Sequence, residues 1–212
     1  MDFAQDVAYR QVINEICDLK WSKLTTDDMV SVAWGYYYFS IQFRENLEIA
    51  RELYPDDAKL QRLEQEECDT SNLSPWPGVA MPGEKMNHDE FMYRALALSP
   101  IPVEKSARLK SIGAEYLAES RAADPISCAL SIASYEDGGL ESVFTAILTA
   151  RHWDNALLQA FRHFLSEHVR FDSDPDQGHG ALSRHMAPDD RVLGLWEAFR
   201  DMLVRSAPAL LD

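Results

Sequence analysis

An apolar helical stripe leads into an imidazole and a carboxylate in the stretch Leu157-Leu-Gln-Ala-Phe161-Arg-His-Phe164-Leu-Ser-Glu-His168-Val-Arg-Phe-Asp172. Leu157, Phe161 and Phe164 recur at helical spacing, which predicts a helix with one face in the core. His168 and Asp172 continue that face, because residues four apart on a helix point the same way. A buried carboxylate is strongly unfavourable unless a positive charge meets it. The stretch therefore predicts either a basic side chain or a metal ion opposite Asp172.

His179 follows Asp172 by seven residues, with Pro175 and Gly178 between them. In an unbroken helix this spacing would separate the two side chains by about 10 Å along the axis. The chain must therefore fold back between residues 175 and 178 if His179 is to share a metal ion with Asp172. Asp176, three residues before His179, is an alternative ligand.

The rest of the chain also has helical periodicity, interrupted by turn residues. Thr25 and Asp124 are N-cap signals, and Pro125 stands at the first helical position. We find no strand, internal repeat or low-complexity tract. We expect a single domain, residues 1–212, that forms an all-α bundle of seven or eight helices. The expected helices cover approximately residues 3–19, 25–54, 56–68, 87–99, 103–119, 124–150, 157–172 and 188–202.

The composition argues against several classes of function. Lys and Arg total 20 against 35 Asp and Glu, a net charge of -15, and such a surface repels nucleic acid and anionic membranes. The three cysteines form no Cys-x-x-Cys pair, which favours a reducing compartment. The first residues lack the pattern of a signal peptide, and no apolar run reaches the length of a membrane span. We expect a cytoplasmic protein that binds neither nucleic acid nor a membrane.

Glu136 interrupts a row of apolar residues on a predicted core face. The residues at helical spacing around it are Ile132, Leu140, Val143 and Ile147. This pattern predicts an inward-facing carboxylate on a central helix.

His88 shares its helical face with Phe91 and other apolar residues, and Glu66-Glu67 ends the predicted helix 56–68. Spacing alone does not settle which of the two glutamates faces inward. Together with the late residues, these positions give two or three inward carboxylates and three histidines on four predicted helices. Mixed carboxylate and imidazole ligation without thiolate suits iron or manganese better than structural zinc. No histidine has a glutamate three residues before it, which excludes the ferritin-like di-iron pattern.

In this order, the motifs resemble those of the heme-oxygenase-like di-iron oxidases and oxygenases. That family has a Glu-Glu pair ending one helix, a histidine opening the next, a glutamate on a central helix, and a late His-x-x-x-Asp followed by a histidine. The corresponding residues here are Glu66-Glu67, Asn87-His88, Tyr135-Glu136 and His168-Val-Arg-Phe-Asp172. By position, Glu66 resembles the ligand of the pair. Two features depart from the family pattern: the long gap between Glu66 and His88, and the late position of His179.

The resemblance implies a heme-oxygenase-like fold and a site for two Fe(II) ions. The implied ligands are Glu66, His88, Glu136, His168, Asp172 and His179, with Glu67 and Asp176 as alternatives. Glu136 is the natural bridging ligand, because it lies on a central helix.

The activity implied by the resemblance is that of a non-heme di-iron monooxygenase or oxidase. O₂ would be the co-substrate, and an external reductant is a further candidate component. The expected reaction is N-oxygenation of a small amine or amino-acid-derived metabolite towards a hydroxylamine or nitro product. Desaturation or C–C cleavage of an amino-acid or fatty-acid substrate is the alternative. Members of the family often form homodimers, so a homodimer is an open alternative to a monomer.

Two readings from other classes of protein compete with this one. The first is a metal-free helical binding protein, in which Arg151, Arg162 or Arg170 would pair with the inward carboxylates. The second is a thiaminase-like hydrolase with Cys128 as the nucleophile. We also expect the segment 74–83, which contains Trp76, to form a lid over the site.

Overall fold

The computed structural model describes residues 8–69, 75–172 and 178–212, and within these ranges the chain forms ten α-helices and no β-strand. The all-α prediction is confirmed. The number of helices exceeds the predicted seven or eight, because the helix expected over residues 124–150 is split in two and a short helix follows residue 178. The helices are α1 Ala8–Cys17, α2 Thr26–Leu53, α3 Ala58–Asp69, α4 His88–Ala97, α5 Val103–Arg121, α6 Pro125–Glu136, α7 Gly139–Ile147, α8 Ala156–Asp172, α9 His179–Ser183 and α10 Leu193–Ser206.

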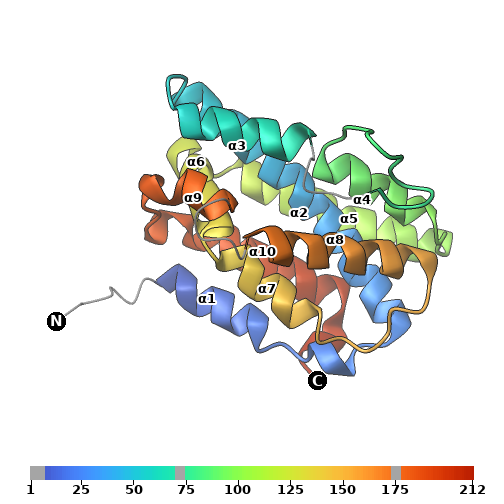
Figure 1. Cartoon of the computed structure of the whole chain (residues 1–212). Helices are drawn as coiled ribbons and strands as arrows, with labels where there is room; N and C mark the ends of the chain where they lie inside the picture. Colours follow the sequence, from blue (N-terminus) through green and yellow to red (C-terminus); the bar gives the residue numbers. More distant parts are fainter. Residues whose placement is uncertain (1–7, 70–74, 173–177) are drawn as a thin grey trace.

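Helix α2 is the central element, and α3, α4, α5, α6, α8 and α10 all pack against it (Figure 1). A capping box fixes its start: the Asp28 backbone N–H donates to the Thr25 side chain, and the Asp28 carboxylate accepts from the Thr25 backbone N–H. Residues 29–33 are buried without interruption, so more than one face of α2 is covered.

One hydrophobic cluster extends through the described chain, from Tyr9 in α1 to Leu210 near the C-terminus. Aromatic rings of α2 and α8 meet in its centre, where the Tyr36 ring centroid lies 5.4 Å from those of both Phe161 and Phe164. The stripe that opens α8 therefore faces the core, as its spacing predicts. In the described ranges no helix has the length and apolar character needed to cross a bilayer.

A glycine in the left-handed region breaks the helix predicted over residues 124–150. Helix α6 ends at Glu136, Gly138 has a φ of 88°, and α7 begins at Gly139. Residues with a side chain adopt this conformation at a cost, whereas glycine does not. The prediction of one continuous helix is wrong, because apolar periodicity continues on both sides of the break. The break leaves Glu136 at the C-terminal end of α6.

The chain turns at Gly178 and begins the short helix α9 at His179, where the sequence predicts only a loop. Helix α9 packs against α3 and α6. This approach depends on Gly180, since a Cβ atom there would lie 2.9 Å from the carbonyl oxygen of Glu136. Because Gly180 has no side chain, α9 can approach α6 closely, and His179 lies beside the end of α6.

The segment between α3 and α4 is held against neighbouring helices from residue 75 onward. The Trp76 ring stacks on that of His163 in α8, with centroids 4.6 Å apart. Val79 and Ala80 are buried, and Arg94 of α4 donates to the Val79 carbonyl oxygen at 3.2 Å. The structure thus places the described part of the expected lid on α4 and α8.

Candidate metal centre

Five polar side chains from five helices converge in the interior of the bundle. Each is at most 9% exposed, so the cluster is separated from bulk water. Four of them stand at or near helix ends, where several chain directions can meet at one point. The residues are Glu67 near the end of α3, His88 at the start of α4, Glu136 at the end of α6, His168 within α8 and His179 at the start of α9.

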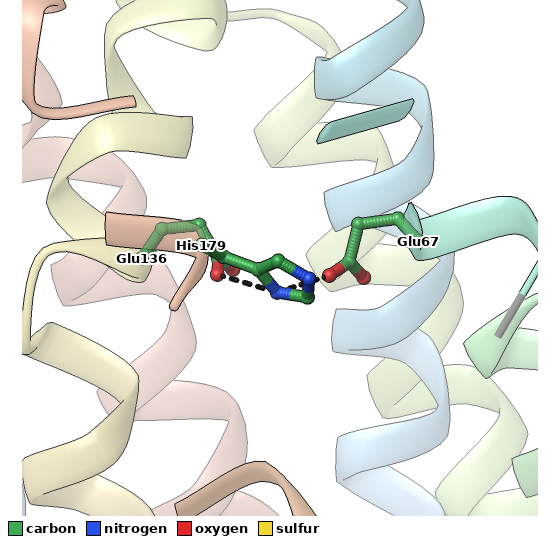
Figure 2. A group of neighbouring side chains, drawn as sticks. All are labelled: Glu67, Glu136 and His179. Carbon is green, nitrogen blue, oxygen red and sulfur yellow. Dashed lines mark ion pairs between the residues drawn. The ribbon is translucent and has the colours of Figure 1, made fainter. Parts of the chain in front are cut away.

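His179 lies between two carboxylates (Figure 2). Its Nδ1 atom is 2.6 Å from Oε1 of Glu67 and 3.2 Å from Oε2 of Glu136. One candidate ligand atom from each of these three residues lies within 4.8 Å of the other two. Donor atoms this close together can reach a single metal ion.

His88 and His168 extend the cluster on the other side of Glu67. Oε2 of Glu67 is 2.9 Å from Nδ1 of His88, and Nε2 of His168 is 3.4 Å from the same nitrogen. Nδ1 of His168 lies 2.8 Å from the carbonyl oxygen of Phe164. Because a carbonyl oxygen only accepts, this contact assigns the proton to Nδ1 and leaves the Nε2 lone pair facing the cluster. Metal-ligating histidines are typically oriented in this way.

His168 and His179 differ in charge, because their surroundings shift their pKa values in opposite directions. Burial, aided by the neighbouring His88, lowers the pKa of His168 to about 3, so that its ring is neutral at pH 7. Burial also opposes charge on His179, but Glu67 and Glu136 outweigh it and hold the pKa of His179 well above its ordinary value. In the metal-free protein, the His179 imidazolium is therefore the cation that meets the buried carboxylates.

The two carboxylates respond differently to this environment. Burial raises the pKa of Glu67, but the charges of His88 and His179 outweigh it and lower that pKa well below its ordinary value. Burial, together with the negative charge of Glu67, raises the pKa of Glu136 despite its hydrogen bond to His179. Glu67 is thus the carboxylate that the cluster holds ionised, and Glu136 is the one that more readily takes up a proton.

Glu67, rather than Glu66, is the inward-facing member of the pair at the end of α3. Its side chain is 6% exposed, against 19% for that of Glu66. Glu66 Oε1 forms an ion pair with Arg62 at 2.6 Å, whereas its Oε2 is 3.6 Å from Nε2 of His179. The helical phase of α3 directs Glu67 at both His88 and His179, whereas Glu66 turns one buried oxygen towards His179, and its expected role as a ligand stays a prediction. Glu66 stays at the edge of the cluster.

Of the six predicted ligands, the structure brings four together and places Glu66 beside them. The backbone of Asp172 ends α8, but its side chain lies outside the described part of the structure, as does Asp176. His179 does fold back towards the cluster, as sharing a metal ion requires. The residue that the sequence left unresolved is Glu67, and the apolar spacing of Leu60 and Leu63 could not distinguish it from its neighbour.

Two buried polar atoms at the cluster make no hydrogen bond within the described residues: Nε2 of His88 and Oε2 of Glu66. Such atoms are rare in folded proteins and call for an explanation. A metal ion would supply the missing partner, since imidazole nitrogen and carboxylate oxygen are ordinary ligands of iron and manganese. The donor set therefore fits the metal that the sequence predicts.

A narrow pocket opens beside the cluster. Glu67, His88, Glu136 and His168 form its polar part. The other lining residues are apolar or hydroxyl-bearing and come from α2 and α7: Tyr36, Phe39, Ser40, Phe43, Leu140 and Phe144. No Lys or Arg is among the residues that line it.

The arginines that a metal-free core would need are engaged elsewhere. Arg170 pairs with Glu167 at 2.5 Å, and the Arg162 guanidinium lies 5.8 Å from the Trp153 ring centroid. Arg151 is exposed. Within the described residues, Glu67 and Glu136 form ion pairs only with histidines.

Cys128 does not have the features of an activated nucleophile. Its Sγ atom is 4.0 Å from the Ala123 carbonyl oxygen, and burial, with the nearby charge of Asp124, raises the pKa of its thiol. A reactive cysteine needs the opposite shift, because the thiolate is the nucleophile. The geometry does not support the hydrolase alternative.

Comparisons with protein-family models, curated proteins and solved structures give no match to this chain.

Proposed function

We propose that the chain is an O₂-dependent non-heme di-iron oxygenase that acts on a small amine or amino-acid-derived metabolite. The observation that carries this proposal is the buried cluster of Glu67, Glu136 and His179, bordered by His88 and His168. Three histidines and at least two carboxylates from five helices form a donor set suited to iron. The motif order, which resembles that of the heme-oxygenase-like di-iron enzymes, supports two Fe(II) ions rather than one.

Glu67, His88, Glu136, His168 and His179 would hold the metal, with Glu66 and Asp172 as further candidate ligands. When bound at these residues, two ferrous ions would supply the electrons for the reduction of O₂. Glu67 and Glu136 provide negative charge to balance the ions, while the Phe164 carbonyl keeps the Nε2 lone pair of His168 directed at them. Metal binding requires a neutral His179 and would thus displace its proton.

The residues that line the narrow pocket beside the cluster, a cavity of about 10 Å³, favour a cationic amine over an anion. Its lining includes the aromatic residues Tyr36, Phe39, Phe43 and Phe144, and the charged residues among its described lining, apart from the histidines, are carboxylates. Aromatic faces and carboxylates attract a cationic amine, whereas they provide no partner for a free carboxylate. The aromatic walls also exclude bulk water from the reacting groups.

Anaerobic loading with Fe(II) tests the proposal. We expect the wild-type protein to bind about two Fe(II) per chain, to consume O₂ on exposure and to transfer labelled oxygen from O₂ into an amine product. Glu136→Gln should lose iron and O₂ consumption, whereas Glu119→Gln, at an exposed carboxylate of α5, should retain both. Iron retention by Glu136→Gln equal to that of Glu119→Gln would contradict the assignment.

A metal-free binding protein is the second candidate, and one observation favours it. His179 already contacts both Glu67 and Glu136, so the two carboxylates have a cationic partner without any metal. In that case, the loaded protein would bind no Fe(II) above the level of Glu136→Gln. Candidate amines would still raise the midpoint of thermal unfolding in the presence of a chelator.

A further inference from the structure

A second cleft lies on the other face of the broken helix that carries Glu136. Residues Glu136, Leu140 and Phe144 face the pocket of the metal centre. Ala133, Ser134 and Asp137 of the same region line a separate cleft of about 540 Å³. The remaining lining residues come from α1, the start of α7 and the segment after α9: Tyr9, Arg10, Ile13, Asn14, Gly138, Gly139, Ser142, Arg184, Ala187 and Pro188. This volume is within the range of small-molecule sites.

The charges of the cleft differ from those of the molecule as a whole. The chain carries a net charge of -15, but the described residues that line the cleft include two arginines and a single carboxylate. Arg184 donates to Asp137 at 2.8 Å, so the charge of that carboxylate is balanced by Arg184. Arg10 forms no ion pair within the described residues, and its guanidinium lies 5.9 Å from the Tyr9 ring centroid. Among the residues that the structure describes, the Arg10 guanidinium is thus without an acidic partner, although the chain as a whole is acidic.

The neutral lining groups complement these arginines. Asn14 adds a side-chain amide donor, whereas Ser142 already uses its hydroxyl proton in a bond to the Gly138 carbonyl oxygen. Gly138 presents bare backbone, because no atom lies within 4 Å of where its Cβ would be. Guanidinium groups bind carboxylate and phosphate oxygens through paired N–H donors.

We propose that this cleft binds a small organic anion, recognised through its carboxylate or phosphate oxygens by Arg10 and Arg184. Binding would take place beside the α6–α7 break without contact with the metal centre. The site is independent of the proposed oxygenase activity, and it remains testable if that activity is disproved.

Isothermal titration with citrate and inorganic phosphate tests the site, with glycerol as a neutral probe and ionic strength held constant. The titrations are carried out on the purified protein without added Fe(II), so that binding of the anions to iron does not contribute. We expect saturable binding of at least one anion and none of glycerol. Preference for citrate would identify a carboxylate ligand, and preference for phosphate would identify a phosphate-bearing one.

Variants at the cleft separate specific binding from general charge effects. Arg10→Gln should weaken anion binding by about tenfold or more while the protein stays folded, because Arg10 is exposed and forms no ion pair in the described structure. Ser142→Phe should fill the cleft and block binding. Arg121→Gln is the control for charge, because Arg121 lies on α5, away from the cleft, where it pairs with Glu45 of α2. This variant also loses one positive charge, and it should leave anion binding unchanged. No saturable binding at millimolar anion, or equal loss of affinity in Arg10→Gln and Arg121→Gln, would overturn the proposal.

Discussion

Glu67 Oε1 lies 2.6 Å from Nδ1 of His179, a contact that joins the end of α3 to the first residue of α9. The other oxygen of the same carboxylate is 2.9 Å from Nδ1 of His88. Glu67 therefore links two histidines from distant parts of the sequence. Both residues are almost fully buried, so the contact is shielded from water and its electrostatic energy is large.

Replacement of Glu67 should abolish metal loading, whereas replacement of its neighbour should not. Glu67→Gln removes the charge that faces both histidines and should weaken Fe(II) binding by at least about tenfold. Glu66→Gln should have a smaller effect, because one Glu66 oxygen is paired with Arg62. Iron content after anaerobic loading and desalting provides the measurement. The reverse order of effects would return the ligand role to Glu66, as the family motif implies.

Loss of His179 should destabilise the metal-free protein. His179→Gln removes the cationic partner of two buried carboxylates, and breaking such a pair typically costs about 3–5 kcal/mol. His185→Gln is the matched control, since His185 pairs with Asp57 at a half-exposed site and should cost less than about 1 kcal/mol. Urea unfolding of both variants at pH 7 with a chelator gives the two free energies. Similar values for the two variants would mean that His179 is not charged in the metal-free protein.

Alkaline pH should destabilise the fold through a buried tyrosine. The Tyr116 hydroxyl donates to Oε1 of Gln42 at 2.9 Å, and burial, with the nearby Tyr135, raises its pKa well above the ordinary value. Because the folded state keeps a proton that the unfolded state loses, this stability is complete below the unfolded pKa of about 10 and declines above it. The free energy of unfolding should fall by up to about 1.4 kcal/mol per pH unit for this group.

Urea unfolding between pH 8 and pH 11 (from about two units below to about one unit above the ordinary tyrosine pKa) measures this slope. Tyr116→Phe should flatten it and cost about 1 kcal/mol at pH 8, where the hydrogen bond to Gln42 is lost. Tyr93→Phe, at an exposed ring, should leave the slope unchanged. A Tyr116→Phe slope equal to the wild-type one would show that Tyr116 does not cause the alkaline loss. Tyr135, whose pKa burial also raises, should account for what remains.

A methyl group at Gly180 should disturb the metal centre without touching the side chain of a ligand residue. The added Cβ would lie 2.9 Å from the Glu136 carbonyl oxygen and push α9 away from α6. Gly180→Ala should lose about 1–3 kcal/mol of stability and part of its iron content. Gly194→Ala in α10, where a Cβ meets no atom within 4 Å, should be neutral or slightly stabilising. Full iron loading of Gly180→Ala would show that the separation of α6 and α9 is not critical.

The local features of the fold could be predicted because their causes lie close together in the sequence. The Thr25 capping box, the Asp124 cap and the apolar stripe of α8 each depend on residues within one or two helical turns. The break at Gly138 could not be predicted in this way, because apolar periodicity does not reveal where a glycine enters the left-handed region. The periodicity also missed α9, a helix of five residues that is too short to carry a periodic signal.

The residues of the candidate site also divide into those that local sequence patterns predict and those that depend on how the helices pack. His88, Glu136 and His168 could be selected from the sequence, since each is a polar residue in an apolar helical row, and all three are buried in the cluster. Glu67 could not be separated from Glu66, because two adjacent residues differ by a rotation that only the docking of α3 decides. The arginine-lined cleft was not anticipated, because α1 and the segment after α9 meet there only in the folded chain.

The sequence alone determined the helical class, the approximate helix boundaries and most of the residues that form the cluster. Helix propensity, capping and apolar spacing are local properties, so they can be recognised without knowing which helices pack together. Only the tertiary structure decided that Glu67 faces His88 and His179, that Gly180 lets α9 approach α6, and that Arg10 and Arg184 share a cleft. These relationships depend on the packing of helices distant in sequence, where burial and close contact between charged groups set the energies.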